Sequence, residues 1–178
     1  MIELRSLLQH NNFKNKMMQI QSELFIKVAL DSWNIQLTRF NKLLETLTDE
    51  QLQQPVATNR NTGVYLLGHL AAIHDAMLPL LKFSAKMYPQ LEEIFITNPD
   101  GYPANKPLAS VLREYWANVN STLASHFNKL NPDEWLQKHA SISDEDFAKE
   151  PYRNRLSVLL NRTNHLSYHY GQLAFLKK

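Results

Sequence analysis

Apolar residues recur every three or four positions along four long stretches of the chain, which is the spacing that places them on one side of an α-helix. In the first stretch this spacing joins Leu24, Val28, Ile35 and Leu43. Glycine is rare, with only 4 residues, and the prolines cluster between these stretches, which also favours helices. The pattern therefore predicts four long helices, over residues 19–47, 62–88, 107–130 and 154–176.

The segments between these stretches carry signals for helix ends. Thr48 with Gln51 three residues later is typical of a capping box, and Asn131 followed by Pro132 is typical of a helix start. The sequence "ASISDEDFAKEPYRN" predicts a short acidic helix that ends at Pro151. The segments "FNKLLETLTDEQLQQ" and "HFNKLNPDEWLQK" resemble each other, which indicates either convergent capping or a weak duplication of helix pairs.

The link over residues 89–106 is long and contains a Pro-Asp-Gly turn. A long connection allows two consecutive helices to run in the same direction, so a simple alternation is not required. The pattern as a whole predicts an all-α fold, a four-helix bundle. We expect one domain over residues 19–178, preceded by an N-terminal extension over residues 1–18.

Composition and charge exclude several classes of function. The net charge is only +2 with both signs interspersed, whereas a nucleic-acid-binding surface needs a basic stripe that neutralises several phosphates. The chain has no cysteine, which excludes disulfides, cysteine–zinc sites and cysteine nucleophiles. No apolar run is long enough to span a membrane, and no secretory signal pattern opens the chain. We expect a cytoplasmic protein with no nucleic-acid or membrane partner.

Two histidines stand four residues apart in the last predicted helix, in the sequence "NHLSYHYGQL". Residues at this spacing differ by only about 40° around a helix, so His165 and His169 share a face. That face is polar and adjoins a row of leucines, which is where helical bundles build metal sites. The pair either binds a metal or fills space in the core. A zincin-type protease is not supported, because Leu166 stands where H-E-x-x-H has its glutamate.

A metal site that keeps a position open for water usually has three protein ligands, so we searched for a third histidine. The second predicted helix offers His69 and His74, which point about 140° apart and cannot easily bind one metal together. Periodicity alone does not choose between them. His126 lies on the inner side of the third predicted helix and is a weaker candidate, whereas His10 and His139 fall in weakly structured or linking segments and are expected to be solvated.

Two motifs taken together resemble a known family. "GHLAAIHDAM" in the second predicted helix and "NHLSYHYGQL" in the last are similar to the pattern of the DinB-like (YfiT-like) family of four-helix proteins. The matching residues are His69, His165 and His169, followed by Gly171 and Gln172. The resemblance covers roughly residues 19–178. The N-terminal extension departs from the family pattern, as does Tyr170, where many relatives carry a basic residue.

The resemblance implies a bundle with up-down-down-up topology and a long crossover between its second and third helices. It implies that His69, His165 and His169 bind a divalent metal, nickel or zinc, with water completing the coordination shell, and that the protein forms a homodimer. The wider superfamily includes S-transferases that use low-molecular-weight thiols, a maleylpyruvate isomerase and members with no known activity. The family name refers to DNA damage induction, but nothing in this composition supports DNA binding.

A bound divalent metal would create a nucleophile from water or from a thiol near neutral pH. We therefore expect a metal-dependent enzyme, a hydrolase or a thiol-dependent S-transferase, that acts on a small molecule. The alternative is a non-catalytic domain that binds metal or dimerises through its helices. Polar residues near the histidines are candidate partners for the ligands, while the tryptophans Trp33, Trp116 and Trp135 are expected mainly in the core. The candidate partners are Tyr65, Asn161, Arg162 and Gln172.

Overall fold

A computed structural model gives the fold and describes residues 2–103 and 105–177, with side chains described for residue 14 and from residue 16 onward. The described residues form helices and loops, and no strand longer than an isolated bridge occurs among them. The predicted all-α class is confirmed. No helix in the described part is both long and apolar enough to cross a membrane.

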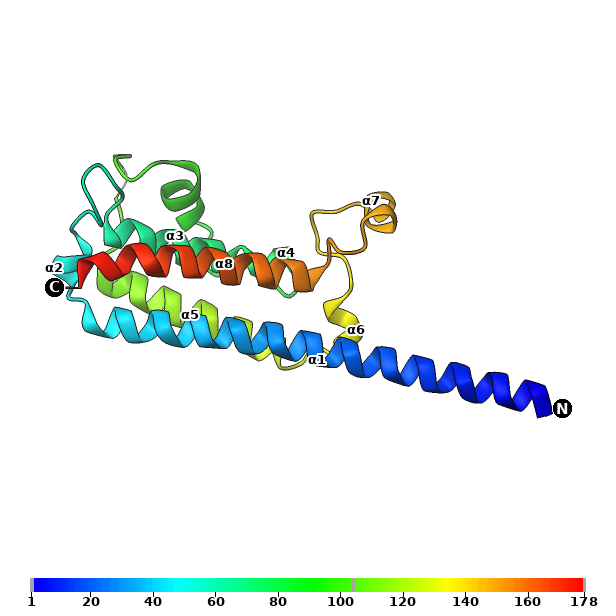
Figure 1. Ribbon diagram of the computed structural model, residues 1–178. Helices are drawn as coiled ribbons and strands as arrows, with labels where there is room; N and C mark the ends of the chain where they lie inside the picture. Colours follow the sequence, from blue (N-terminus) through cyan, green and yellow to red (C-terminus); the bar gives the residue numbers. More distant parts are fainter. Residues whose placement is uncertain (1, 104, 178) are drawn as a thin grey trace.

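Four long helices pack along one another (Figure 1). Helix α1 lies beside α8, and α3 lies beside both α5 and α8. In Figure 1, α1 and α8 run toward the end of the molecule where the chain terminates, while α3 and α5 run the opposite way. Their bounds are α1 Ile2–Thr46, α3 Gly63–Asp75, α5 Ala109–Phe127 and α8 Arg155–Leu173.

Helix α1 begins earlier than the predicted stretch and buries a different face. Its helical backbone starts at Ile2, and its N-terminal part projects beyond the other helices (Figure 1). The predicted apolar row is wrong in part, because Leu24, Val28 and Ile35 are more than half exposed. The helix instead contacts the core through Ile26, Ala29, Trp33, Phe40, Leu43 and Leu44.

The predicted caps between the long helices are confirmed. Thr48 and Gln51 form a capping box at the start of α2 (Asp49–Leu52), and Asn131 forms another with Glu134 at the start of α6 (Pro132–Trp135). Each box satisfies two backbone N–H groups that the first helical turn cannot pair internally. The short acidic helix is also present, as α7 (Asp144–Lys149).

The second long helix ends before the predicted boundary at residue 88. Helix α3 stops at Asp75 and is followed by the single turn α4 (Met77–Leu80), after which the chain leaves the helical path at Lys82 with φ of 60°. The buried Asp75 carboxylate accepts hydrogen bonds from the backbone N–H of Met87 (2.8 Å) and of Tyr88 (2.9 Å). Apolar periodicity continues past residue 80, but these bonds hold the backbone of residues 87–88 in a loop.

The core divides into two clusters along the length of the helices. The predicted tryptophans belong to it, since Trp33, Trp116 and Trp135 are at most 3% exposed. The leucine row beside the histidine pair is buried as predicted, with Leu156, Leu159, Leu166 and Leu173 at most 3% exposed. Helix α8 therefore presents an apolar face to the core, and its two histidines lie at the edge of that face.

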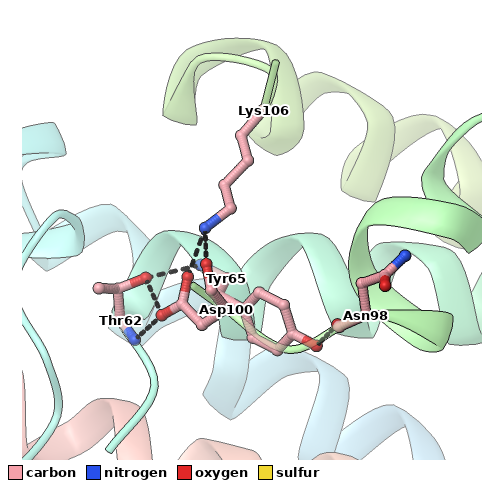
Figure 2. Close-up of polar contacts among 5 residues, drawn as sticks. All are labelled: Thr62, Tyr65, Asn98, Asp100 and Lys106. Carbon is pink, nitrogen blue, oxygen red and sulfur yellow. Dashed lines mark hydrogen bonds and ion pairs between the residues drawn. The ribbon is translucent and has the colours of Figure 1, made fainter. Parts of the chain in front are cut away.

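The long link between α4 and α5 folds back against α3. It contains a π-helical turn, η1 (Glu93–Thr97), which packs against α3. Farther along, Asp100 accepts hydrogen bonds from the backbone N–H (2.6 Å) and the hydroxyl (2.8 Å) of Thr62 (Figure 2). Lys106 forms an ion pair with the same carboxylate at 2.6 Å. Through these contacts residues 100 and 106 of the link are bound to the start of α3, one to two helical turns before His69.

Candidate metal centre

Helix α8 places His165 and His169 one turn apart, with their Nε2 atoms facing each other at 3.1 Å. The two rings meet edge to face, with centroids 4.6 Å apart and planes at 87°. An i, i+4 pair on one helix points the same way, so the shared face that the sequence predicts is confirmed.

Helix α3 brings His69 to the same point from across the fold. Its Nε2 lies 3.2 Å from the Nε2 of His165, and its ring is 5.1 Å from His165 and 5.2 Å from His169, centroid to centroid. One ligand atom from each of the three histidines lies within 4.8 Å of the other two. Residues 96 and 100 positions apart in the chain thus converge on one small volume.

Two of the three rings are oriented by hydrogen bonds from their other nitrogen. The Nδ1–H of His69 donates to the backbone carbonyl of Phe95 at 2.7 Å, and the Nδ1–H of His169 donates to the side-chain oxygen of Gln172 at 2.7 Å. An oxygen of either kind only accepts, so the proton of each neutral ring is on Nδ1 and the lone pair is on Nε2. Histidine ligands of metals are commonly held in this way.

The contact with Phe95 depends on the glycine that precedes His69. A Cβ atom added at Gly68 would lie 2.4 Å from the Phe95 ring, well inside contact distance. The missing side chain lets η1 approach α3 closely enough for the Phe95 carbonyl to reach His69. The sequence carries no signal for this partner, because it is a backbone atom in a segment with no regular periodicity.

The environment keeps the three imidazoles neutral. Burial, together with the charges of His169, His69 and Arg162, lowers the pKa of His165 to about 4. Burial also lowers the pKa of His69 and of His169 and outweighs the hydrogen bonds that each makes through Nδ1. At neutral pH all three rings therefore present lone pairs, which is the form that binds metal.

The donor set fits a divalent metal. With the Nδ1 protons of His69 and His169 committed, both of their Nε2 lone pairs point at the Nε2 of His165, and a single proton there can bridge only one of them. Three neutral imidazoles suit borderline metals such as zinc and nickel. Within the described residues no fourth histidine or carboxylate joins the group, so the group consists of three candidate ligands.

The other candidate histidines lie elsewhere. His74 is fully buried between Trp33 and Trp116, and its Nδ1 lies 2.8 Å from the Asn120 side-chain oxygen. Burial lowers its pKa to about 3. His126 stacks flat on Phe83, with centroids 4.6 Å apart, so it is not a fourth ligand. The side chain of His10 lies outside the described residues. His139, predicted to be solvated, is partly buried and lines a pocket.

The candidate partners divide in the same way. Gln172 contacts His169 as predicted. Tyr65 instead donates its hydroxyl to the Asn98 carbonyl at 2.6 Å (Figure 2), and its ring lies parallel to that of His69 at 6.4 Å. Arg162 contacts the Asn161 side chain rather than a histidine. No neighbouring element packs closely against Gly171, because a Cβ added there would meet open space.

Comparison with known proteins decides the family. The family model described as the DinB superfamily matches residues 33–173, most of the chain. The chain belongs to the DinB superfamily. The resemblance that the two histidine motifs indicated is therefore confirmed, and the match includes all three site histidines. A search of curated proteins found no match.

A solved structure has a similar fold. The crystal structure of a conserved protein from Enterococcus faecalis aligns with a TM-score of 0.58 and 17% sequence identity. The alignment covers 85% of this chain and 94% of that protein. At this identity the likeness concerns the fold alone.

Proposed function

We propose that this DinB protein is a metal-dependent enzyme whose divalent metal is bound by His69, His165 and His169. The helices form the up-down-down-up four-helix bundle of the family in this proposal, and the helix directions in Figure 1 support it. The observation that carries the proposal is the convergence of three Nε2 atoms, two of them on rings oriented through Nδ1.

Nickel or zinc is the metal that we propose, because three neutral imidazoles match their preference. When bound, such a metal supplies a Lewis acid that lowers the pKa of a bound water or thiol. The chain contributes the orientation of the ligands. Phe95 holds the ring of His69, Gln172 holds that of His169, and the buried leucines of α8 restrict water on the core side.

The reaction that we propose is hydrolysis of a small molecule or transfer of a low-molecular-weight thiol to one. With only three protein ligands in the described group, the centre has room for a substrate, and His69 and His165 are only partly buried. A thiol would come from a cosubstrate, because the chain has no cysteine. The same lack of cysteine is in keeping with a reducing compartment, and we propose a cytoplasmic location.

Metal content tests the proposal first. Plasma mass spectrometry on tag-free protein is expected to find near one nickel or zinc per chain. His165→Ala is expected to lose it, whereas His126→Ala, a matched change of a histidine outside the centre, is expected to keep it. Loaded protein would then be screened with hydrolase and thiol-transfer substrates. A metal-free wild type after incubation with nickel or zinc would overturn the site. A metal with no turnover would favour the non-catalytic alternative.

We also propose that the protein is a homodimer that pairs through α1. This helix exposes three apolar side chains close together in the sequence, Leu24 (62%), Phe25 (59%) and Val28 (58%), and contiguous exposed apolar surface marks interaction sites. Light scattering after size exclusion is expected to find a dimer. Phe25→Glu is expected to give a monomer, and Leu108→Glu, at a residue 72% exposed on another segment, is expected to leave the dimer intact. A wild-type monomer would overturn this proposal.

A further inference from the structure

A second feature of the structure is a pocket beside the N-terminal half of α8. Its volume is about 360 Å³, which lies within the range of sites for small molecules. The end of α4, the segment around residue 139 and the residues just before α8 form its walls together with α8 itself. The lining residues that matter for its chemistry are His139, Tyr152, Arg153, Asn161 and Arg162.

The ionisable residues that line this pocket include basic side chains and no acidic one. Its lining contains two arginines and a histidine but no aspartate or glutamate. Glu150, outside the lining, pairs with Arg153 at 2.9 Å and also accepts a hydrogen bond from the hydroxyl of Tyr152 at 2.6 Å. Arg153 is therefore neutralised at least in part, and Arg162 supplies the positive charge that remains.

Arg162 and Arg155 have no carboxylate partner among the described residues, and of these two only Arg162 lines the pocket. Arg113 and Arg153 each pair with a carboxylate, whereas the side chain of Arg162 makes one hydrogen bond, to the Asn161 side-chain oxygen at 3.4 Å. Its Nε is buried and has no partner among the described residues. Burial lowers the pKa of this guanidinium, which means that the protein holds a charge at a cost in solvation. Buried charges of this kind are normally paired.

His139 adds a donor from the segment between α6 and α7. Its Nδ1 lies 3.3 Å from the backbone N–H of Ser141, and a backbone N–H can only donate. The proton of the neutral ring is therefore on Nε2. Burial, with Arg153 and Lys82 nearby, lowers the pKa of His139, so the neutral ring predominates at pH 7. The lining thus contains hydrogen-bond donors from two segments, His139 and the two arginines.

The pocket also adjoins the histidine centre. Arg162 precedes His165 by three residues, which is roughly 4.5 Å along the helix axis and nearly the same face. Its charge acts on His69 and His165, whose pKa values it helps to lower. One side chain therefore belongs both to the pocket and to the surroundings of the three histidines.

We propose that this pocket binds the anionic group of the substrate, a carboxylate or a phosphate, and that Arg162 is its principal partner. This inference rests on the proposed function, and it names a substrate class: small molecules with an oxyanion group a short distance from the reacting atom. The planar guanidinium matches either oxyanion with two parallel hydrogen bonds, and Arg153 adds a weaker, already paired charge.

Calorimetric titration of inorganic phosphate and of succinate into the purified protein at fixed ionic strength tests this, with metal content measured in parallel. Arg162→Gln is expected to weaken binding by roughly tenfold or more, the range for a lost charged hydrogen bond. Arg162→Lys is expected to recover part of it, and Arg153→Gln to lose less. Arg60→Gln, at an exposed arginine in the loop before α3, is the matched control and is expected to bind as wild type.

The outcomes separate this inference from the metal proposal. Loss of anion binding in Arg162→Gln and, to a lesser extent, in Arg153→Gln, with metal content unchanged, supports the pocket. Binding of phosphate alone or of succinate alone would narrow the class. An oxyanion held by the metal only would be unaffected by Arg153→Gln, and that result would overturn the inference. So would wild-type protein that binds neither probe. A metal-free wild type that still binds anions through Arg162 would instead overturn the proposed function alone.

Discussion

His69 and His74 lie five residues apart in α3, yet their surroundings differ in almost every respect. His69 is partly buried, faces two other histidines and donates through Nδ1 to a backbone carbonyl. His74 is fully buried between two tryptophans and faces an asparagine. Burial lowers the pKa of both. A candidate ligand therefore differs from a packing residue in the direction of its ring-nitrogen lone pair and in the side chains that face this nitrogen.

The largest expected difference between the two histidines is the effect of replacing His74 on the stability of the protein. His74→Ala removes a ring packed 4.9 Å from Trp33 and 4.6 Å from Trp116, centroid to centroid, and deprives the side-chain oxygen of Asn120 of its partner. We expect a loss of about 2–5 kcal/mol in the free energy of unfolding, as for other large-to-small changes in a core. Urea unfolding measures the loss, and metal content is expected to stay at the wild-type level. A His74→Ala variant with wild-type stability but no bound metal would contradict the assignment of His74 as a packing residue.

The next effect is the pH dependence of His74. Its folded-state pKa is about 3, below the ordinary value of 6.5, so the unfolded chain binds more protons between these values. The stabilising contribution is complete above pH 6.5 and is lost as the pH falls toward 3. We expect urea unfolding of chelator-treated protein to show a decline in the free energy of unfolding from pH 7 to pH 5, to which the three site histidines also contribute because burial lowers their pKa values. A flat profile would mean that His74 is less isolated from solvent than its position implies.

A smaller effect concerns the approach of η1 to His69. Gly68→Ala places a Cβ 2.4 Å from the Phe95 ring and displaces the carbonyl that orients His69. We expect metal affinity to fall roughly 10- to 100-fold, the usual range for loss of a partner behind a ligand. Competition with a chromogenic chelator measures it. Gly171→Ala, where a Cβ meets open space, is the control and is expected to keep full affinity.

The smallest effect is expected at Gln172. Gln172→Ala removes the acceptor for His169 Nδ1 but leaves α8 and the ring in place. We expect metal affinity to fall by about tenfold, at the lower end of the range for such partners, because His169 is also confined by burial. Competition with the chromogenic chelator measures this change in metal affinity. Equal affinity in Gln172→Ala and wild type would show that packing alone orients the ring.

The sequence predicted the parts of this site that depend on local spacing. The i, i+4 relation placed His165 and His169 together, and helix capping placed the starts of α2 and α6. The choice of His69 over His74 came from the family resemblance, since both lie on apolar faces of one helix. No periodicity could point to the Phe95 carbonyl, because a backbone acceptor carries no side-chain signal.

Two further features of the fold could not be predicted from the spacing of apolar residues. The end of the second long helix depends on Asp75, whose carboxylate binds backbone 12 and 13 residues later. The buried face of α1 depends on its neighbours, and its exposed residues Leu24, Val28 and Ile35 show the helical spacing expected of a core. In both cases long-range contacts decide between alternatives that are equivalent locally.

X-ray absorption spectroscopy on the metal-loaded protein tests the central claim most directly. It reports the atoms bound to nickel or zinc, so it counts imidazoles without an assumption about activity. The account predicts three imidazole nitrogens from His69, His165 and His169, with oxygen donors completing the shell. A shell without imidazole, or one closed by a fourth imidazole, would contradict it.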